Sequence, residues 1–97
     1  MNWNELADHD VTVYSTPTCG DCRRLKSIFS RNNLQYTEVD IDADEAAATA
    51  LVERTGHRAI PYVEVDGKAL VKGWHKDHPN RWDEAKFFAD IDAALAG

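Results

Sequence analysis

The chain consists of short blocks in which apolar residues recur at a regular spacing. The spacing is two residues in some blocks and three or four in others. Val11–Tyr14 combines β-branched and aromatic residues, which predicts a buried strand. In Cys22–Asn32 the apolar residues recur every three to four positions, which predicts an amphipathic helix with its arginines facing water. Tyr36–Ile41 returns to a spacing of two and predicts a second strand.

A second helix is predicted to follow that strand. Asp42 or Asp44 can cap its first turn, and Gly56 can end it, because glycine adopts the left-handed conformation that often closes a helix. The predicted inner face of this helix consists of Ala47, Ala50, Leu51 and Val52.

The rest of the chain predicts a hairpin and a terminal helix. Pro61–Val65 and Lys68–Val71 are two strand candidates, and Asp66-Gly67 between them is a tight-turn signal. Pro79 can occupy the first turn of the last helix. Its predicted apolar stripe is Trp82, Ala85, Phe88, Ile91 and Leu95, with Phe87 off the stripe.

The element order βαβαββα predicts the α/β class, with a four-stranded mixed sheet flanked by three helices. A chain of 97 residues with 43% apolar residues fits one domain, residues 1–97, around one core. In open α/β sheets the functional site lies beyond the carboxyl ends of the strands. We therefore expect the chemistry in the loop after the first strand, which carries both cysteines.

Charge narrows the possible partners. The net charge is −6, and no basic stripe with interleaved aromatic residues is present, so we expect no nucleic-acid partner. The first ten residues contain three acidic residues and no apolar run, and no segment is long and apolar enough to span a membrane. These features predict a cytoplasmic protein without a membrane partner, and we expect a monomer.

The cysteines, Cys19 and Cys22, stand three residues apart between a strand and a helix. A bridge across so short a loop adds little stability, so a redox or metal role is the more natural one. Cys19 precedes the first helical turn, where unpaired backbone N–H groups favour a thiolate and lower the thiol pKa. Cys22 lies inside the helix. We therefore predict a dithiol oxidoreductase in which Cys19 attacks and Cys22 resolves.

Two features leave alternatives open. Asp21 suits the positive helix end, yet its charge opposes a neighbouring thiolate, unless Arg23 or Arg24 offsets it. A metal module is the second hypothesis: the cysteines with His75 and His78 could form a Cys2His2 zinc site, or one Cys19 from each of two protomers could bridge an iron–sulfur cluster. Otherwise we expect both histidines on the surface.

The chain resembles the glutaredoxin family in Val11–Cys22, in Tyr36–Ile41 and in Thr55–Pro61. The resemblance implies a thioredoxin-like fold and reduction of disulfides and mixed disulfides on oxidised or thiol-modified proteins by a low-molecular-weight thiol, with no bound cofactor. It also implies that Pro61 follows a cis peptide bond, that the backbone of Ile60 binds the thiol or peptide, and that Arg58 holds the carboxylate of a thiol.

Two departures from the family pattern concern the reducing thiol. Gly20-Asp21 stands where common dithiol glutaredoxins have Pro-Tyr, and a glycine there is similar to thioredoxins and mycoredoxins. The family's Gly-Gly-x-Asp glutathione clamp is replaced by a single Gly73 beside Trp74, which is either a lid on the core or a substrate platform. Glutathione, mycothiol and direct recycling by a flavin-dependent reductase, as in redoxins that serve one partner enzyme, all remain open.

Overall fold

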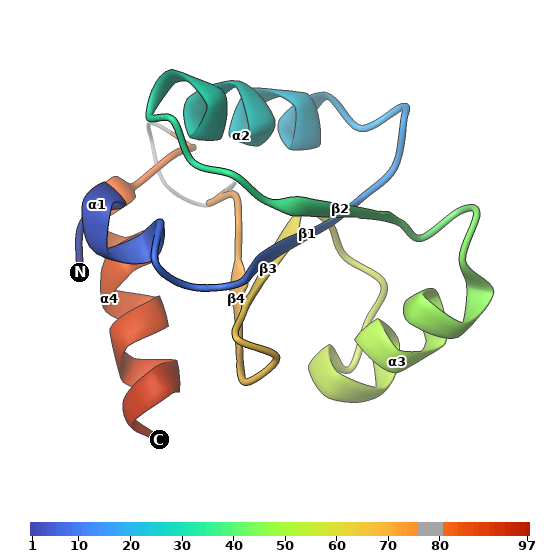
Figure 1. Cartoon of the computed structure of the whole chain (residues 1–97). Coiled ribbons are helices and arrows are strands. Elements are labelled where there is room, and N and C mark those ends of the chain that lie inside the picture. Colours follow the sequence, from blue (N-terminus) through green and yellow to red (C-terminus); the bar gives the residue numbers. More distant parts are fainter. Residues whose placement is uncertain (76–80) are drawn as a thin grey trace.

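The computed structural model describes residues 1–75 and 81–97, and its centre is a four-stranded sheet in the order β2-β1-β3-β4 (Figure 1). The strands are β1 (Val11–Ser15), β2 (Thr37–Asp40), β3 (Tyr62–Val65) and β4 (Ala69–Lys72). β1 runs parallel to β2 and antiparallel to β3, which pairs antiparallel with β4. The predicted mixed sheet of the thioredoxin-like class is confirmed.

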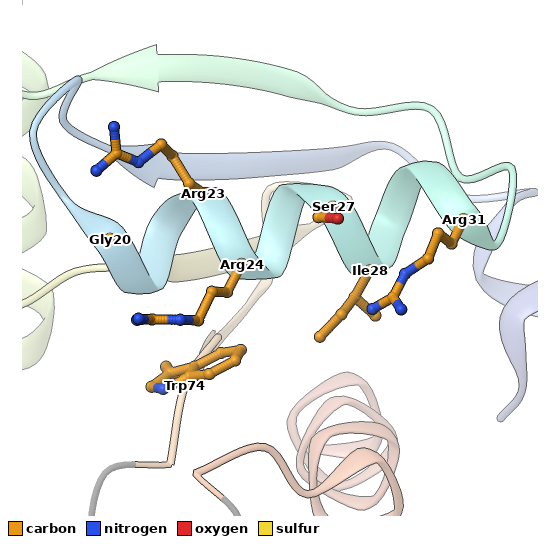
Figure 2. A pocket seen from close by; sticks show the side chains of 7 residues that line it. All are labelled: Gly20, Arg23, Arg24, Ser27, Ile28, Arg31 and Trp74. Carbon is orange, nitrogen blue, oxygen red and sulfur yellow. The ribbon is translucent and has the colours of Figure 1, made fainter.

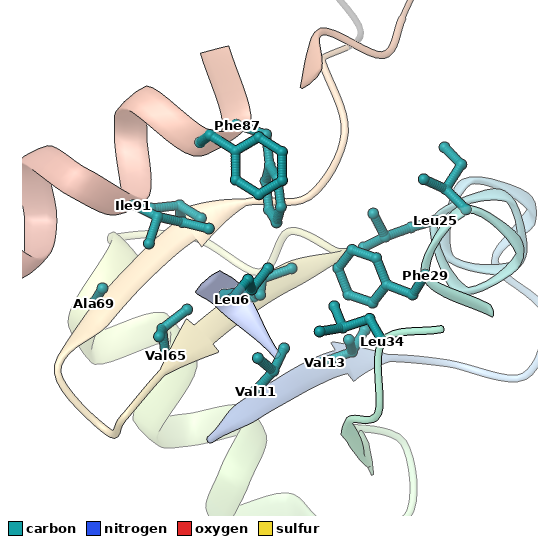
Figure 3. Packing of buried hydrophobic residues seen from close by; sticks show 14 of the residues in the cluster. Leu6, Val11, Val13, Leu25, Phe29, Leu34, Val65, Ala69, Phe87 and Ile91 are labelled. Carbon is teal, nitrogen blue, oxygen red and sulfur yellow. The ribbon is translucent and has the colours of Figure 1, made fainter. Parts of the chain in front are cut away.

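Helices cover both faces of the sheet. They are α1 (Trp3–Leu6), α2 (Gly20–Arg31), α3 (Glu45–Thr55) and α4 (Glu84–Ala96). Successive strand residues point to opposite faces. Val13 belongs to a large cluster with side chains of α1, α2 and α4 (Figure 3). Its neighbour Tyr14 packs instead with side chains of α3. The main core therefore lies on the α2 and α4 face, and a smaller one lies under α3.

The short helix α1 was not predicted, because a single turn shows no hydrophobic periodicity. Leu6 is fully buried in the main core. Trp3 packs edge-to-face on Phe29 and Phe88, and its indole Nε1 donates a hydrogen bond to Glu84 at 2.9 Å. These contacts tie the N-terminal segment to α2 and α4.

Helix α2 begins at Gly20, two residues before the predicted start, and ends at Arg31. The predicted ends of α3 are confirmed, but part of its predicted inner face is wrong. Asp44 caps α3, and Gly56 ends it with a φ of 85°. Leu51 and Ala48 are buried, whereas Ala50 is exposed and Val52 has 38% of its surface exposed. The buried side of this helix is the narrow line of Ala48 and Leu51; Val52 lies beside that line, and Ala50 lies on the side that faces away from it.

The terminal helix starts later than expected. Asp83 caps it and Glu84 is its first residue, while Pro79 lies outside the described residues. Trp82 therefore precedes the helix, and Ala85 is exposed rather than part of the stripe. Phe87, which was predicted to lie off the stripe, is fully buried. The reason is that the helix presents the pair 87–88 to the sheet, so both rings enter the core.

Two further features concern the turn and the membrane. Asp66 and Gly67 have φ values of 56° and 67°, which these residue types tolerate, and the predicted hairpin turn is confirmed. No helix in the described ranges combines the length and the apolar character needed to cross a membrane.

Candidate active site

Cys19 lies directly before α2, after a loop that leaves the carboxyl end of β1. Its backbone is extended, and its Sγ accepts a hydrogen bond from the backbone N–H of Cys22 at 3.1 Å. Its own N–H donates to the carbonyl of Thr16 at 3.3 Å. The sulfur therefore occupies the capping position at the positive end of the helix, where an anion is stabilised. The predicted position of Cys19 before the first helical turn is confirmed.

The two cysteines are joined by a disulfide, and their Cα atoms lie 5.2 Å apart. Cys22 is fully buried inside the first turn of α2, whereas Cys19 is partly exposed. Only the sulfur of Cys19 is therefore open to an incoming disulfide, and Cys22 stands close enough to displace whatever Cys19 has bound. This geometry can carry dithiol–disulfide exchange.

The charge of Asp21 is paired within the same helix. Its carboxylate accepts a hydrogen bond from the guanidinium of Arg24 at 2.8 Å. Of the two arginines that could offset this acid, Arg24 forms the ion pair, and no described residue forms one with Arg23. The repulsion that Asp21 exerts on a thiolate at Cys19 is thus reduced.

Pro61 lies at the same end of the sheet as the cysteine loop. Tyr62 pairs with Tyr14 near the end of β1, which places the preceding Pro61 level with Ser15. The Ile60–Pro61 peptide bond is cis, as predicted, and Pro61 is buried. The carbonyl of Pro61 accepts a hydrogen bond from the N–H of Gly73 at 3.0 Å.

Gly73 is a point of close approach between β4 and α2. A Cβ at this position would lie 2.6 Å from a methyl carbon of Leu25 and 3.4 Å from Cγ of Pro61. The absence of a side chain therefore lets Pro61 and the cysteine-bearing helix meet over the same residue. Cys22, one turn before Leu25, lies on that same inner face of α2.

Arg58 and Ile60 belong to the loop between α3 and β3. The guanidinium of Arg58 is exposed and donates a hydrogen bond to Asp42 at 2.6 Å, which links the two loops that flank α3. Ile60 is half-buried against the small core under α3. A ligand carboxylate would have to share Arg58 with Asp42.

The two residues after Gly73 are both buried. Trp74 exposes only 9% of its surface and stacks on Trp82, with ring centroids 5.9 Å apart. His75 was expected on the surface, which is wrong: it is 4% exposed, and its Nδ1 accepts a hydrogen bond from the N–H of Asp83. His75 thus joins β4 to the start of α4. His78 lies outside the described residues.

The described residues contain no cluster of three or more His, Cys, Asp or Glu side chains suited to a metal ion. Cys19 and Cys22 are engaged with each other in the disulfide.

A groove that the sequence did not reveal runs along α2 from the residue after Cys19. It encloses about 520 Å³, and its lining residues are Gly20, Arg23, Arg24, Ser27, Ile28, Arg31 and Trp74 (Figure 2). We call it the α2 groove. The pattern showed the arginines on the wet side of the helix, but only the fold places Trp74 opposite them. Trp74 packs on the core, as expected of a lid, and it also lines this groove.

Comparisons with known proteins agree with this geometry. The family model described as Glutaredoxin matches residues 11–70. A candidate glutaredoxin of Mycobacterium tuberculosis is 40% identical over 62 residues, which cover 62% of this chain and 74% of that protein. Glutaredoxin 3 of Escherichia coli is 27% identical over 61 residues, which cover 63% and 74%.

Solved structures show the same fold. The thioredoxin-like protein BC3987 has a TM-score of 0.62 and 27% identity, over 84% of this chain and all of that one. Buckwheat glutaredoxin, solved with glutathione, has a TM-score of 0.61 at 23% identity, over 97% and 86% of the two chains. Since the family match spans the strand, the cysteine pair and the cis-proline described above, the chain belongs to the glutaredoxin family of thiol–disulfide oxidoreductases.

Proposed function

We propose that this protein reduces mixed disulfides and protein disulfides in the cytoplasm, and that a low-molecular-weight thiol, either mycothiol or glutathione, recycles it. The observation that carries the proposal is the capping geometry of Cys19, whose partly exposed sulfur accepts the N–H of Cys22. An anion is stabilised at this point, and only this sulfur of the pair can be reached.

The reaction with a protein disulfide has two exchange steps. The Cys19 thiolate attacks one substrate sulfur, a mixed disulfide forms, and the other substrate sulfur leaves as a thiolate that takes up a proton. The Cys22 thiol then loses its proton and attacks the sulfur of Cys19, which releases the second substrate thiol and closes the Cys19–Cys22 disulfide. Two electrons pass from the dithiol to the substrate.

Recycling returns these two electrons. One molecule of the small thiol opens the Cys19–Cys22 disulfide and remains bound to Cys19, and a second one displaces it as the oxidised small-thiol disulfide. With a protein–small-thiol mixed disulfide as substrate, Cys19 takes the small thiol and releases the protein thiol. A second small thiol then completes the cycle without Cys22.

Arg58, Ile60 and Pro61 are the proposed binding residues for the small thiol or the substrate peptide. What supports this proposal is that Pro61 lies at the end of the sheet from which the cysteine loop leaves, and that Ile60 directly precedes it. Arg58 is exposed on the same loop and could exchange Asp42 for a ligand carboxylate. A thiol without a carboxylate would leave the Arg58–Asp42 pair intact.

The choice between reductants can be tested in one experiment. Reduction of hydroxyethyl disulfide is coupled to NADPH consumption in three parallel assays, which contain glutathione with its reductase, mycothiol with its reductase, or thioredoxin reductase alone. Cys19→Ser serves as the control. Turnover with either small thiol supports the proposal. Turnover with thioredoxin reductase alone assigns the protein to the directly recycled redoxins, and no turnover above the control in any assay overturns the proposed function.

A further inference from the structure

The α2 groove concentrates positive charge in an acidic protein. Its described lining holds three arginines and no acidic residue, in a chain whose net charge is −6. The remainder of the molecule is therefore strongly negative. An acidic partner is repelled by most of the surface and attracted by this face.

Two of the three arginines that line the groove have no carboxylate partner among the described residues. Arg24 is paired with Asp21, whereas neither Arg23 nor Arg31 forms an ion pair with any described residue, and both are exposed. Figure 2 shows that Arg24 and Arg31 leave α2 on the side of Trp74, while Arg23 leaves it on the other side. The charge thus lines one side of the groove and continues over its rim.

The groove has the dimensions of a short extended peptide. Its lining positions on α2 recur at three- and four-residue steps from Gly20 to Arg31, which makes one continuous stripe of the helix. This stripe is roughly 16 Å long at the rise of an α-helix, enough for about five residues of extended chain. Ile28 and Trp74 supply apolar surface between the charges.

One end of the groove also lies next to Cys19 in the chain. Gly20, its first lining residue, directly follows Cys19, and Cys19 is the partly exposed cysteine of the pair. A peptide that lies along α2 can therefore present its own cysteine at Cys19 while its flanking residues occupy the groove.

We propose that the α2 groove binds an acidic segment next to the oxidised cysteine of the protein substrate, and that this contact selects substrates by charge. The inference rests on the proposed function and names the substrate class for the same site. Guanidinium groups pair with carboxylates through charge-assisted hydrogen bonds, and such pairs speed association more than they strengthen the final complex.

The test uses peptides that contain one disulfide flanked on both sides by five acidic, five neutral or five basic residues. Pre-reduced protein is mixed with each peptide, and released peptide thiols are counted after acid quenching, so that no recycling system is involved. The acidic peptide should react roughly tenfold faster than the basic one at low salt, and this difference should shrink as salt is added.

Matched variants locate the effect. Arg31→Gln should slow the reaction with the acidic peptide by roughly two- to fivefold, the range expected for loss of one exposed ion pair. Lys68→Gln removes the same charge at the β3–β4 turn and should leave that rate unchanged. Circular dichroism checks that both variants retain the helix content of the wild type.

The possible results separate the two proposals. Equal rates for the acidic and basic peptides, or equal slowing by Lys68→Gln and Arg31→Gln, would overturn the acidic-segment site. In a separate assay, glutathione opens the Cys19–Cys22 disulfide of the oxidised protein. An Arg31→Gln effect confined to that assay, with no effect on the acidic peptide, would also overturn the acidic-segment site and assign the groove to a small anionic thiol. If the wild-type protein reduces none of the peptides, the proposed function itself fails.

Discussion

At the N-termini of α2 and α3, different side chains accept an otherwise unpaired backbone N–H of the first turn. Cys19 accepts the N–H of the residue three positions later at 3.1 Å, and Asp44 does the same at the start of α3 at 3.0 Å. Both capping residues have extended backbone. At α4 the cap is again a carboxylate, Asp83. A cysteine thus stands where the two other long helices have an acid.

This difference separates stability from chemistry. Asp is among the preferred capping residues and Cys is not, so α2 gives up part of the stabilisation that Asp44 provides at α3. In return, a reduced Cys19 places its thiolate where a capping carboxylate would lie, among N–H groups that stabilise negative charge. The comparison predicts that a replacement of the α2 cap can preserve stability but not activity. At α3, removal of the cap should lower stability but leave activity unchanged.

Replacing Cys19 by serine should have the largest effect. Serine is a good helix cap, so the free energy of unfolding under reducing conditions should not fall relative to the reduced wild type. Thiol–disulfide exchange should be abolished, because the remaining Cys22 is fully buried. Parallel activity and urea-unfolding measurements check both statements. Residual turnover in this variant would show that Cys22 can attack substrates directly.

Cys22→Ser should remove one activity of the protein and leave the other. The first attack by Cys19 remains, so a mixed disulfide with a protein substrate should accumulate and be visible by intact-mass spectrometry. Turnover with mixed disulfides of the small thiol should persist, while reduction of protein disulfides should be lost. If Cys22→Ser and Cys19→Ser are equally inactive on mixed disulfides, the assigned roles are wrong.

Much of the fold and the reacting pair could be predicted from the sequence, because local signals determine them. The β-branched block at Val11–Tyr14, the helical spacing after Cys22 and the Asp66-Gly67 turn each require only neighbours in the chain. The capping position of Cys19 followed from its place between a strand and a helix. The cis state of the bond before Pro61 was implied by the resemblance and not by any local pattern.

What could not be predicted depends on contacts between distant segments. Leu6 is fully buried because it packs in one cluster with residues of strands and helices that lie far along the chain. Phe87 enters the core because α4 presents the pair 87–88 to the sheet, so that both rings pack in the main core. The α2 groove needs Trp74 from the end of β4 opposite the arginines of α2, and no spacing in the chain reports that pairing.

The pKa of the Cys19 thiol sharpens the comparison further. In the reduced protein we expect the pKa to lie below the ordinary value of a cysteine, because the first turn of α2 stabilises the thiolate. The rate of alkylation by iodoacetamide, measured against pH in Cys22→Ser, reports it directly. An ordinary pKa would mean that the capping hydrogen bond contributes nothing to reactivity.

Asp44→Ala tests the other helix. Removing this cap should lower the free energy of unfolding by about 1 kcal/mol, since the N–H of Ala47 loses its acceptor. Activity per folded molecule should not change, because α3 covers the face of the sheet opposite α2. Asp44→Ser should restore most of the stability in urea unfolding. A loss of activity in Asp44→Ala at full folding would show that the two helix ends are coupled.

The smallest expected effect on stability concerns a carboxylate that accepts a backbone N–H outside any helix. Asp66 accepts hydrogen bonds from the side chain of His9 and, at 2.9 Å, from the N–H of Asp10. The His9 contact first, and the Asp10 bond second, hold the pKa of Asp66 below its ordinary value of 3.8. Because this pKa is lower in the folded protein, the carboxylate stabilises the fold above about pH 4. The stabilisation disappears as the pH falls through the pKa of Asp66 in the folded protein.

Asp66→Asn keeps a side chain that tolerates the φ of 56° and can still accept the N–H of Asp10. The difference in free energy of unfolding between wild type and Asp66→Asn should therefore be present at pH 6 and shrink toward pH 3. The same series in a His9→Ala background should show a smaller pH dependence, and an unchanged one would assign the shift to the backbone N–H alone.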